Sequence, residues 1–151
     1  MVSLQTDRPG FFNDLAEEIR LFFDAVQIVP REDAQARAPQ AGDLLVEAWL
    51  DTRADPWLAL AKATLQTKSG PQRMEYRYAH PAVTGGALVR KRYEKRCMKI
   101  AVFRALAALF PGARIPWGSL TGIRPTRLLR ELEQGEGEAE AARIMLEEFD
   151  V

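Results

Sequence analysis

The chain has 151 residues, of which 47% are hydrophobic and 28% are charged, and this composition is that of an ordinary globular domain with a core of its own. Its 21 basic and 21 acidic side chains give a formal net charge of zero, which excludes a molecule-wide attraction to nucleic acid or to a membrane surface. The signs are unevenly spread, because residues 90–99 are basic and residues 131–150 are acidic.

The first third of the chain predicts short strands around one helix. Val2 to Gln5 is a strand candidate, and residues 26–29 are a second one that ends at Pro30. Between them, residues 10–25 carry apolar side chains at three- and four-residue steps, which predicts an amphipathic helix. Residues 31–42 are rich in Ala, Pro, Gln and charge, and we expect an exposed loop there.

Three further strands follow, over residues 44–52, 57–67 and 72–78, separated by turn residues. They predict an antiparallel meander. The third alternates cleanly, so that two sets of side chains should point to opposite faces of the sheet: Met74, Tyr76 and Tyr78 on one, and Arg73, Glu75 and Arg77 on the other.

From Gly86 the pattern becomes helical, and residues 100–110 are apolar on nearly all sides, which implies burial. A helix over residues 126–132 should begin after Pro125, a break is expected at Gln134, Gly135 and Gly137, and residues 138–149 form a last amphipathic helix. Together the elements predict an α+β fold. A small, mainly antiparallel sheet with one packed helix occupies residues 1–82, and a helical part in residues 83–151 joins it in one compact domain.

The chain has one cysteine and one histidine. A single cysteine cannot form a disulfide within the chain, which suits a reducing cytoplasm. Cys97 lies on the apolar side of its predicted helix, so we expect a packing residue; a reactive thiol activated by Arg96 and Lys99 is the less favoured alternative. His80 is expected to be a loop residue without a catalytic role. The first residues do not form a signal peptide, and residues 100–110 are too short to span a bilayer, so we expect a soluble, cytoplasmic protein.

The basic run offers one candidate surface, formed by Arg92, Lys95, Arg96 and Lys99 on adjoining helical faces. A solvated face is the simplest interpretation. The alternatives are that this face docks an acidic partner, binds carboxylates or binds nucleic acid. Nucleic acid is the least favoured of these, because no series of aromatic residues for base stacking accompanies the charges. The aromatic residues Trp49, Trp57, Tyr76 and Tyr78 are expected to pack on the sheet.

The most unusual stretch is Pro116-Trp117-Gly118-Ser119-Leu120-Thr121-Gly122-Ile123-Arg124-Pro125-Thr126, hereafter the signature segment. Its prolines and glycines constrain the backbone tightly. Arg124 beside a helix start could form an anion site, or could tie the loop to carbonyl or acidic groups; Trp117 could anchor the loop in a core or stack on a ligand. The candidate anion-binding or domain-docking residues are Arg124, Thr121, Thr126, Arg127 and Trp117.

The signature segment resembles the Pro-Trp-Gly-x-Leu-Thr-Gly-Ile-Arg-Pro-Thr motif near the amino terminus of coproporphyrinogen dehydrogenase-type radical-SAM proteins, the HemZ-like branch of the oxygen-independent coproporphyrinogen III oxidases. The resemblance is strongest over residues 90–132 and covers residues 1–80 in outline only. Arg127 stands where relatives often carry lysine. The resemblance implies a parent enzyme of haem biosynthesis that binds a [4Fe-4S] cluster and S-adenosylmethionine in a catalytic barrel, and that barrel would be expected to begin near Val151.

These observations leave three functions open. The favoured one is an accessory domain that packs on or covers the radical-SAM barrel of the same parent protein, with no catalytic residue, metal or cofactor of its own, because one cysteine cannot supply the three thiolates that such a cluster needs. The second is a stand-alone module that uses residues 90–99 on an anionic partner such as RNA. The third is a small enzyme built on Arg124 and His80.

Overall fold

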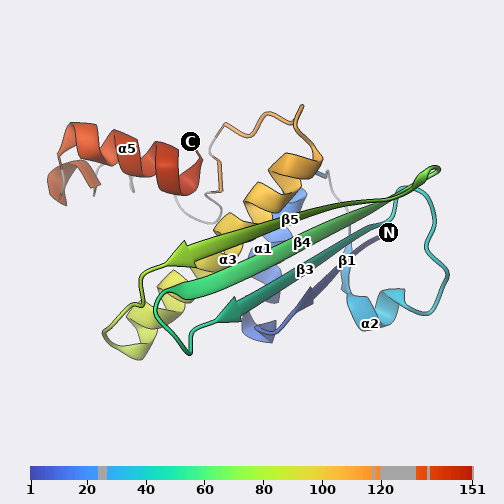
Figure 1. Ribbon diagram of the computed structural model, residues 1–151, viewed down its shortest axis with the longest axis horizontal. Coiled ribbons are helices and arrows are strands. Elements are labelled where there is room, and N and C mark those ends of the chain that lie inside the picture. Colours follow the sequence, from blue (N-terminus) through green and yellow to red (C-terminus); the bar gives the residue numbers. More distant parts are fainter. Residues whose placement is uncertain (24–26, 117, 120–131, 136, 151) are drawn as a thin grey trace. The chain divides into compact units, whose positions relative to one another are not determined.

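A mixed five-stranded sheet organises the first part of the chain (Figure 1). The computed structural model describes residues 1–23, 27–116, 118–119, 132–135 and 137–150. These belong to two compact units, Met1–Gly112 and Ala113–Val151, which are described separately. The strand order is β2-β1-β3-β4-β5, and the strands span Val2–Thr6 (β1), Ile28–Pro30 (β2), Leu44–Asp51 (β3), Trp57–Thr67 (β4) and Gly70–His80 (β5).

Two kinds of strand pairing meet at β3. Strands β3, β4 and β5 form the antiparallel meander that the sequence predicts, whereas β1 pairs in parallel with both β2 and β3. The parallel pairings need crossovers on both sides of β2, and these are long enough to contain helices. The helices of this unit are η1 (Pro9–Phe11), α1 (Phe12–Arg20), α2 (Arg31–Ala34) and α3 (Ala87–Leu109).

Helices α1 and α3 cover one face of the sheet, which we call the helix face, and they lie behind the strands in Figure 1. Alternate residues of each strand point into this layer, as a period of two requires. Three fully buried alanines of β4, Ala59, Ala61 and Ala63, lie in the strand on which α3 packs, and their small size lets the helix come close to the sheet. The core also includes Leu4, Val46, Trp57, Leu15, Ile19, Met98, Val102 and Leu106.

The α+β fold agrees with the sequence-based prediction, but several boundaries differ. Helix α3 packs on β4 and β5, so it belongs to the same unit as the sheet, and the division falls after Gly112 rather than after residue 82. Two helices, not one, cover the sheet. The helix predicted over residues 10–25 ends at Arg20, and residues 31–42 contain the short helix α2 within the predicted loop.

The second unit contains helix α5, Glu138–Phe149. Residues 132–135 are already helical, so the predicted break is not at Gln134 or Gly135. Gly137 has φ of 85°, a conformation that favours glycine, and the chain leaves the helix there before α5 begins. Met145 and Phe149 are buried, and the partly buried side chains of Leu132 and Ile144 pack against them.

Candidate functional site

The basic run on α3 does not form one exposed face. Arg92 is exposed, but Lys95 lies 3.4 Å from the Asp14 carboxylate of α1, and the Arg96 guanidinium lies 4.8 Å from the centre of the Tyr93 ring. The fourth predicted residue, Lys99, is buried against α1. Much of the predicted positive surface is therefore committed to holding α3 in place.

Lys99 and Glu18 form a buried ion pair between α3 and α1. The Lys99 Nζ lies 3.6 Å from Glu18 Oε1, and the Glu18 side chain is fully buried. Burial lowers the pKa of Lys99, and the charges of Glu18 and Asp14 oppose that change. A buried charge needs such a partner because desolvation of an isolated ion is costly. The helical spacing of the basic run gave no signal of this inward position.

Most of the signature segment lies outside the residues that the structure describes. The candidate anion-binding or docking residues Trp117, Thr121, Arg124 and Thr126 of this segment, and Arg127 just after it, all lie outside the described residues. Gly118 and Ser119 are described, and they contact the end of α5. Ser119 donates two hydrogen bonds to the Phe149 carbonyl oxygen, from its amide (2.7 Å) and from its hydroxyl (3.2 Å). The carbonyl of a last helical turn lacks a partner within the helix, so Ser119 caps α5.

Gly118 is required by this contact. Its φ is +56°, and a Cβ built on it would overlap the Phe149 carbonyl oxygen. An L residue with a side chain would therefore suffer both backbone strain and collision. One glycine of the signature segment thus has a packing reason that the sequence did not reveal.

The described residues do not fit an iron–sulfur cluster. Cys97 is buried in the core of the first unit, as predicted, and a single thiolate cannot hold a [4Fe-4S] cluster. Within the part of the chain that the structure describes, no three His, Cys, Asp or Glu side chains lie together as a metal site would require. His80 ends strand β5 instead of lying in a loop, and its Nδ1 is 2.8 Å from the Pro81 carbonyl oxygen.

The aromatic residues are divided between the two faces of the sheet. Trp57 is buried on the helix face, and Tyr76 and Tyr78 pack against the same core. The Arg104 guanidinium of α3 lies 5.4 Å from both tyrosine rings and donates a hydrogen bond of 3.0 Å to the Tyr76 hydroxyl. Trp49 alternates with buried residues of β3 and is half-buried on the opposite face. The four aromatics therefore do not form a single platform.

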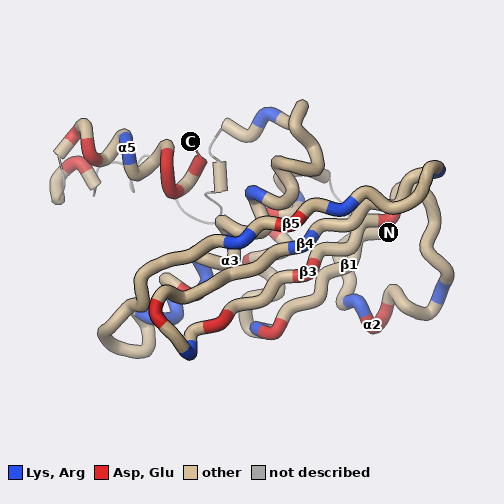
Figure 2. Tube along the Cα trace, viewed as in Figure 1, with Lys and Arg blue, Asp and Glu red and all other residues tan. Residues whose placement is uncertain are grey.

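The face opposite α1 and α3, which we call the outer face, carries polar side chains in register. Ser3, Leu45, Thr64 and Arg73 form one row across four strands, because each is the pairing partner of the next. Among these strands, β5 carries basic and acidic residues in alternation, and its blue and red segments are visible in Figure 2. At the amino-terminal end of β1, the segment 31–43 lies beside this row.

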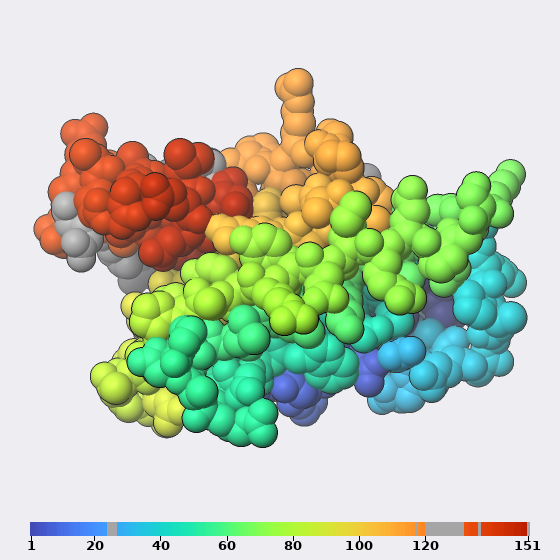
Figure 3. Space-filling model, in the orientation of Figure 1, coloured from blue at the N-terminus to red at the C-terminus, as the bar shows by residue number. Residues whose placement is uncertain are grey.

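A cavity of about 390 Å³ lies between that segment and the outer face. In Figure 3 the segment is the light-blue to cyan region at the right of the view, beside the green strands. Arg31, Arg37 and Arg73 line the cavity, together with the buried hydroxyl residues Ser3 and Thr64. Its size is within the range of small-molecule sites. The sequence analysis did not predict this site. The available signal was that Thr64 and Arg73 are polar residues at alternating positions of their own strands, which places them on the outer face.

Two carboxylates at the cavity are paired with cations. Asp43 accepts hydrogen bonds from the Met1 ammonium (2.9 Å), from Arg37 Nη2 (2.8 Å) and from the Gln40 amide (2.9 Å). Burial acts to raise the pKa of Asp43, but these hydrogen bonds outweigh it and lower the pKa to about 2. Glu47 Oε1 lies 3.5 Å from Arg31 Nη1, which also donates a hydrogen bond of 2.6 Å to Gln5. The Asp43 carboxylate is therefore ionised at neutral pH.

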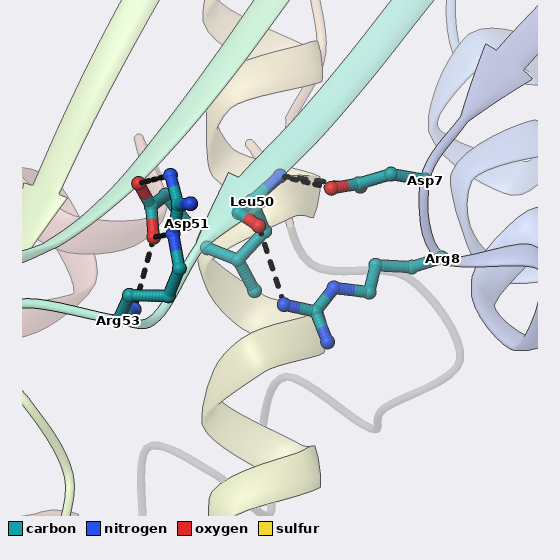
Figure 4. Close-up of polar contacts among 5 residues, drawn as sticks. All are labelled: Asp7, Arg8, Leu50, Asp51 and Arg53. Atoms are coloured by element: carbon teal, nitrogen blue, oxygen red, sulfur yellow. Dashed lines mark hydrogen bonds and ion pairs between the residues drawn. The ribbon is translucent and has the colours of Figure 1, made fainter.

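A second hollow of about 380 Å³ lies at the opposite end of β3, and Figure 4 shows its polar contacts. Asp7 accepts a hydrogen bond of 3.2 Å from the Leu50 amide, and Arg8 Nη2 donates one of 3.2 Å to the Leu50 carbonyl. Asp51 is held by Arg53, whose hydrogen bonds lower the pKa of that carboxyl to about 2. These groups extend the pairing of β1 with β3 beyond Thr6, so we assign them a structural role.

In the described part of the chain, no helix combines the length and apolarity that a bilayer crossing requires. We compared the chain with protein-family models, with curated proteins and with solved structures, and none of the three comparisons gives a match.

Proposed function

We propose that this chain is an accessory domain of a radical-SAM, coproporphyrinogen dehydrogenase-type enzyme of haem biosynthesis, which packs on or covers the catalytic barrel. The signature segment, residues 116–126, carries this proposal, because its order of prolines, glycines, tryptophan and arginine resembles that family's motif. The cluster and S-adenosylmethionine would be bound by the barrel, since this chain offers one buried thiol.

The packing of Gly118 and Ser119 supports a role for the signature segment in organising structure. Ser119 caps α5 through the Phe149 carbonyl, and Gly118 lies close against the same carbonyl. A domain that docks on a barrel needs a fixed surface, and a constrained loop anchored at Gly118 and Ser119 would help to provide one. Arg124, with Thr121, Thr126 and Arg127, would then contact the barrel or an anionic group of its substrate.

The alternative of a stand-alone module that binds RNA through residues 90–99 receives less support. Lys99 is buried with Glu18, and Lys95 is paired with Asp14, so two of the four cations are drawn toward α1. Nucleic-acid binding depends on cations that remain available to phosphates.

The first test reads the coding sequence beyond codon 151 for a Cys-x-x-x-Cys-x-x-Cys motif. The second compares, under anaerobic conditions, the whole enzyme with a variant that lacks residues 1–151. We expect the variant to keep the cluster's EPR signal and uncoupled cleavage of S-adenosylmethionine, but to lose coproporphyrinogen turnover or substrate affinity by about tenfold or more. Intact turnover and KM would contradict the proposal.

A point variant keeps the test decisive if the deletion variant does not fold. Arg124→Gln in the whole enzyme removes the cation of the signature segment, and Arg77→Gln, at an exposed position of β5, is its control. We expect Arg124→Gln alone to raise KM for coproporphyrinogen or to lower turnover. Equal kinetics for both variants would count against a role of the signature segment at the barrel.

A further inference from the structure

The cavity beside the segment 31–43 carries positive charge that its own carboxylates do not neutralise. Three guanidinium groups and the Met1 ammonium face two carboxylates there, those of Asp43 and Glu47. Each carboxylate already has an arginine partner, Arg37 for Asp43 and Arg31 for Glu47. The third arginine, Arg73, is exposed and forms no ion pair with any residue that the structure describes.

Arg37 places an unused donor inside the protein. Its Nη2 is bound to Asp43, whereas its Nη1 is buried and has no hydrogen-bond partner among the described residues. A buried charged donor without an acceptor costs free energy, because it loses its hydration and gains nothing in return. Arg37 also lines the cavity, so an acceptor that binds there and draws Nη1 toward it would remove this cost.

The strands supply neutral donors on the same row. Ser3 and Thr64 are buried, and Thr64 pairs in register with Arg73. The cavity lining also includes the apolar side chains of Ala34, Pro39 and Leu45. Hydroxyl and guanidinium donors beside apolar surface match a ligand that has an oxyanion at one end and an organic body at the other.

We propose that this cavity binds the phosphate or carboxylate group of a small organic anion. Arg37 Nη1 binds the oxyanion at the inner end of the cavity, and Arg73 on β5 binds it at the open end. Arg31, which Glu47 and Gln5 hold in place, contributes further positive charge. A metal cation is disfavoured at the same place because both carboxylates are engaged by arginines. The inference does not depend on the proposed radical-SAM function, and its test requires no enzyme activity.

The test is a ¹H–¹⁵N NMR titration of the whole chain with three probes that share a phenyl ring: phenylphosphate, benzoate and benzyl alcohol. We expect saturable shifts at the amides of Ser3, Leu45 and Thr64 with the two anions and none with the neutral alcohol. The tighter of the two anions identifies the phosphate or the carboxylate as the preferred group. Equal shifts with benzyl alcohol, or no saturable shifts, would overturn the proposal.

Arginine variants locate the binding. Arg37→Gln and Arg73→Gln should each weaken binding of the preferred anion by about tenfold or more, as the loss of a charge-assisted hydrogen bond predicts. Arg77→Gln is the matched control, because Arg77 lies on the same strand and the same face but outside the cavity, and it is paired with Glu75. If Arg37→Gln fails to fold, Arg73→Gln decides, since Arg73 is exposed. Unchanged affinity in Arg73→Gln, or an equal loss in Arg77→Gln, refutes the site.

Discussion

The two sides of the sheet are built from alternate residues of the same strands, but they hold charge differently. On the helix side, Lys99 and Glu18 are buried between α3 and α1 and neutralise each other. On the outer face, Arg37 and Asp43 are partly exposed, at 34% and 18% of their side-chain surface, and one Arg37 nitrogen keeps an unused hydrogen. The first pair joins two helices in the core, whereas the second borders a cavity that a ligand can enter.

The largest expected change in stability comes from replacing one tryptophan on each side of the sheet. Trp57→Ala removes a side chain that is 2% exposed on the helix face, and we expect it to lower the free energy of unfolding by about 3–5 kcal/mol. Trp49→Ala on the outer face should cost less than about 1 kcal/mol, because that side chain is only half-buried. Urea unfolding followed by circular dichroism measures both. Similar losses would show that the outer face contributes as much packing as the helix face.

The second test opens the buried ion pair. Glu18→Gln leaves the Lys99 ammonium buried without its carboxylate, and we expect a loss of about 3 kcal/mol at pH 7. The control is Glu17→Gln, since Glu17 forms an exposed pair with Arg20 and should cost less than about 0.5 kcal/mol. Thermal unfolding of both variants gives the difference.

The pH dependence of this loss identifies its cause. Burial lowers the pKa of Lys99 in the folded state below its ordinary 10.5, so the folded protein releases that proton at lower pH than the unfolded chain does. The cost of burying the charge therefore declines as pH rises toward 10.5. A Glu18→Gln loss that stays constant from pH 7 to pH 10 would mean that packing, and not the unpaired ammonium, accounts for it.

The third test concerns the second unit. Gly118→Ala should destabilise the cap of α5 by about 1–3 kcal/mol, because φ is positive there and the new Cβ would meet the Phe149 carbonyl. Gly135→Ala is the control. Gly135 is helical, and a Cβ built there has no atom within 4 Å, so alanine fits without collision. Hydrogen exchange of the α5 amides, compared with those of β4, reports the local loss. Equal protection of α5 in both variants would contradict the capping role of Ser119.

The sequence predicts the fold where local pattern and burial agree. The alternation of Met74, Tyr76 and Tyr78 correctly places them on one face of β5, because successive side chains of a strand point to opposite faces. Tyr76 and Tyr78 pack against the core, whereas Met74 on the same face is exposed. The parallel pairing of β1 with β3 was not predicted, since it joins strands separated by a helix and a second strand, and nothing local specifies it.

The outer-face cavity could not be predicted for the same reason. Arg37 and Arg73 are far apart in sequence, and they meet at one cavity because strand register and the segment 31–43 bring them there. In contrast, the basic run on α3 was visible in the sequence, but helical spacing alone did not distinguish the inward Lys99 from the exposed Arg92. Charge pattern therefore locates candidate residues, and tertiary packing decides which of them remain accessible.

A smaller effect on stability is expected at Asp43, beside the cavity. Its pKa of about 2 in the folded protein lies below its ordinary 3.8, so the carboxylate contributes stability above about pH 4 and loses that contribution as pH falls toward 2. Asp43→Asn should cost less than about 1 kcal/mol at pH 7, because the group is partly exposed to solvent. The difference in unfolding free energy between the original chain and Asp43→Asn should shrink between pH 4 and pH 2.

Asp51→Asn tests whether a carboxylate paired with a residue close in sequence contributes less to stability than Asp43 does. The pKa of Asp51 is also about 2, but its partner Arg53 is two residues away and exposed, so the pair can form in the unfolded chain as well. Only a pKa difference between folded and unfolded states changes stability with pH. We therefore expect a clearly smaller acid dependence for Asp51 than for Asp43, whose ammonium partner at Met1 is 42 residues distant. Equal acid dependence would mean that the Asp43 contacts at the cavity are no more specific to the fold than a local surface pair.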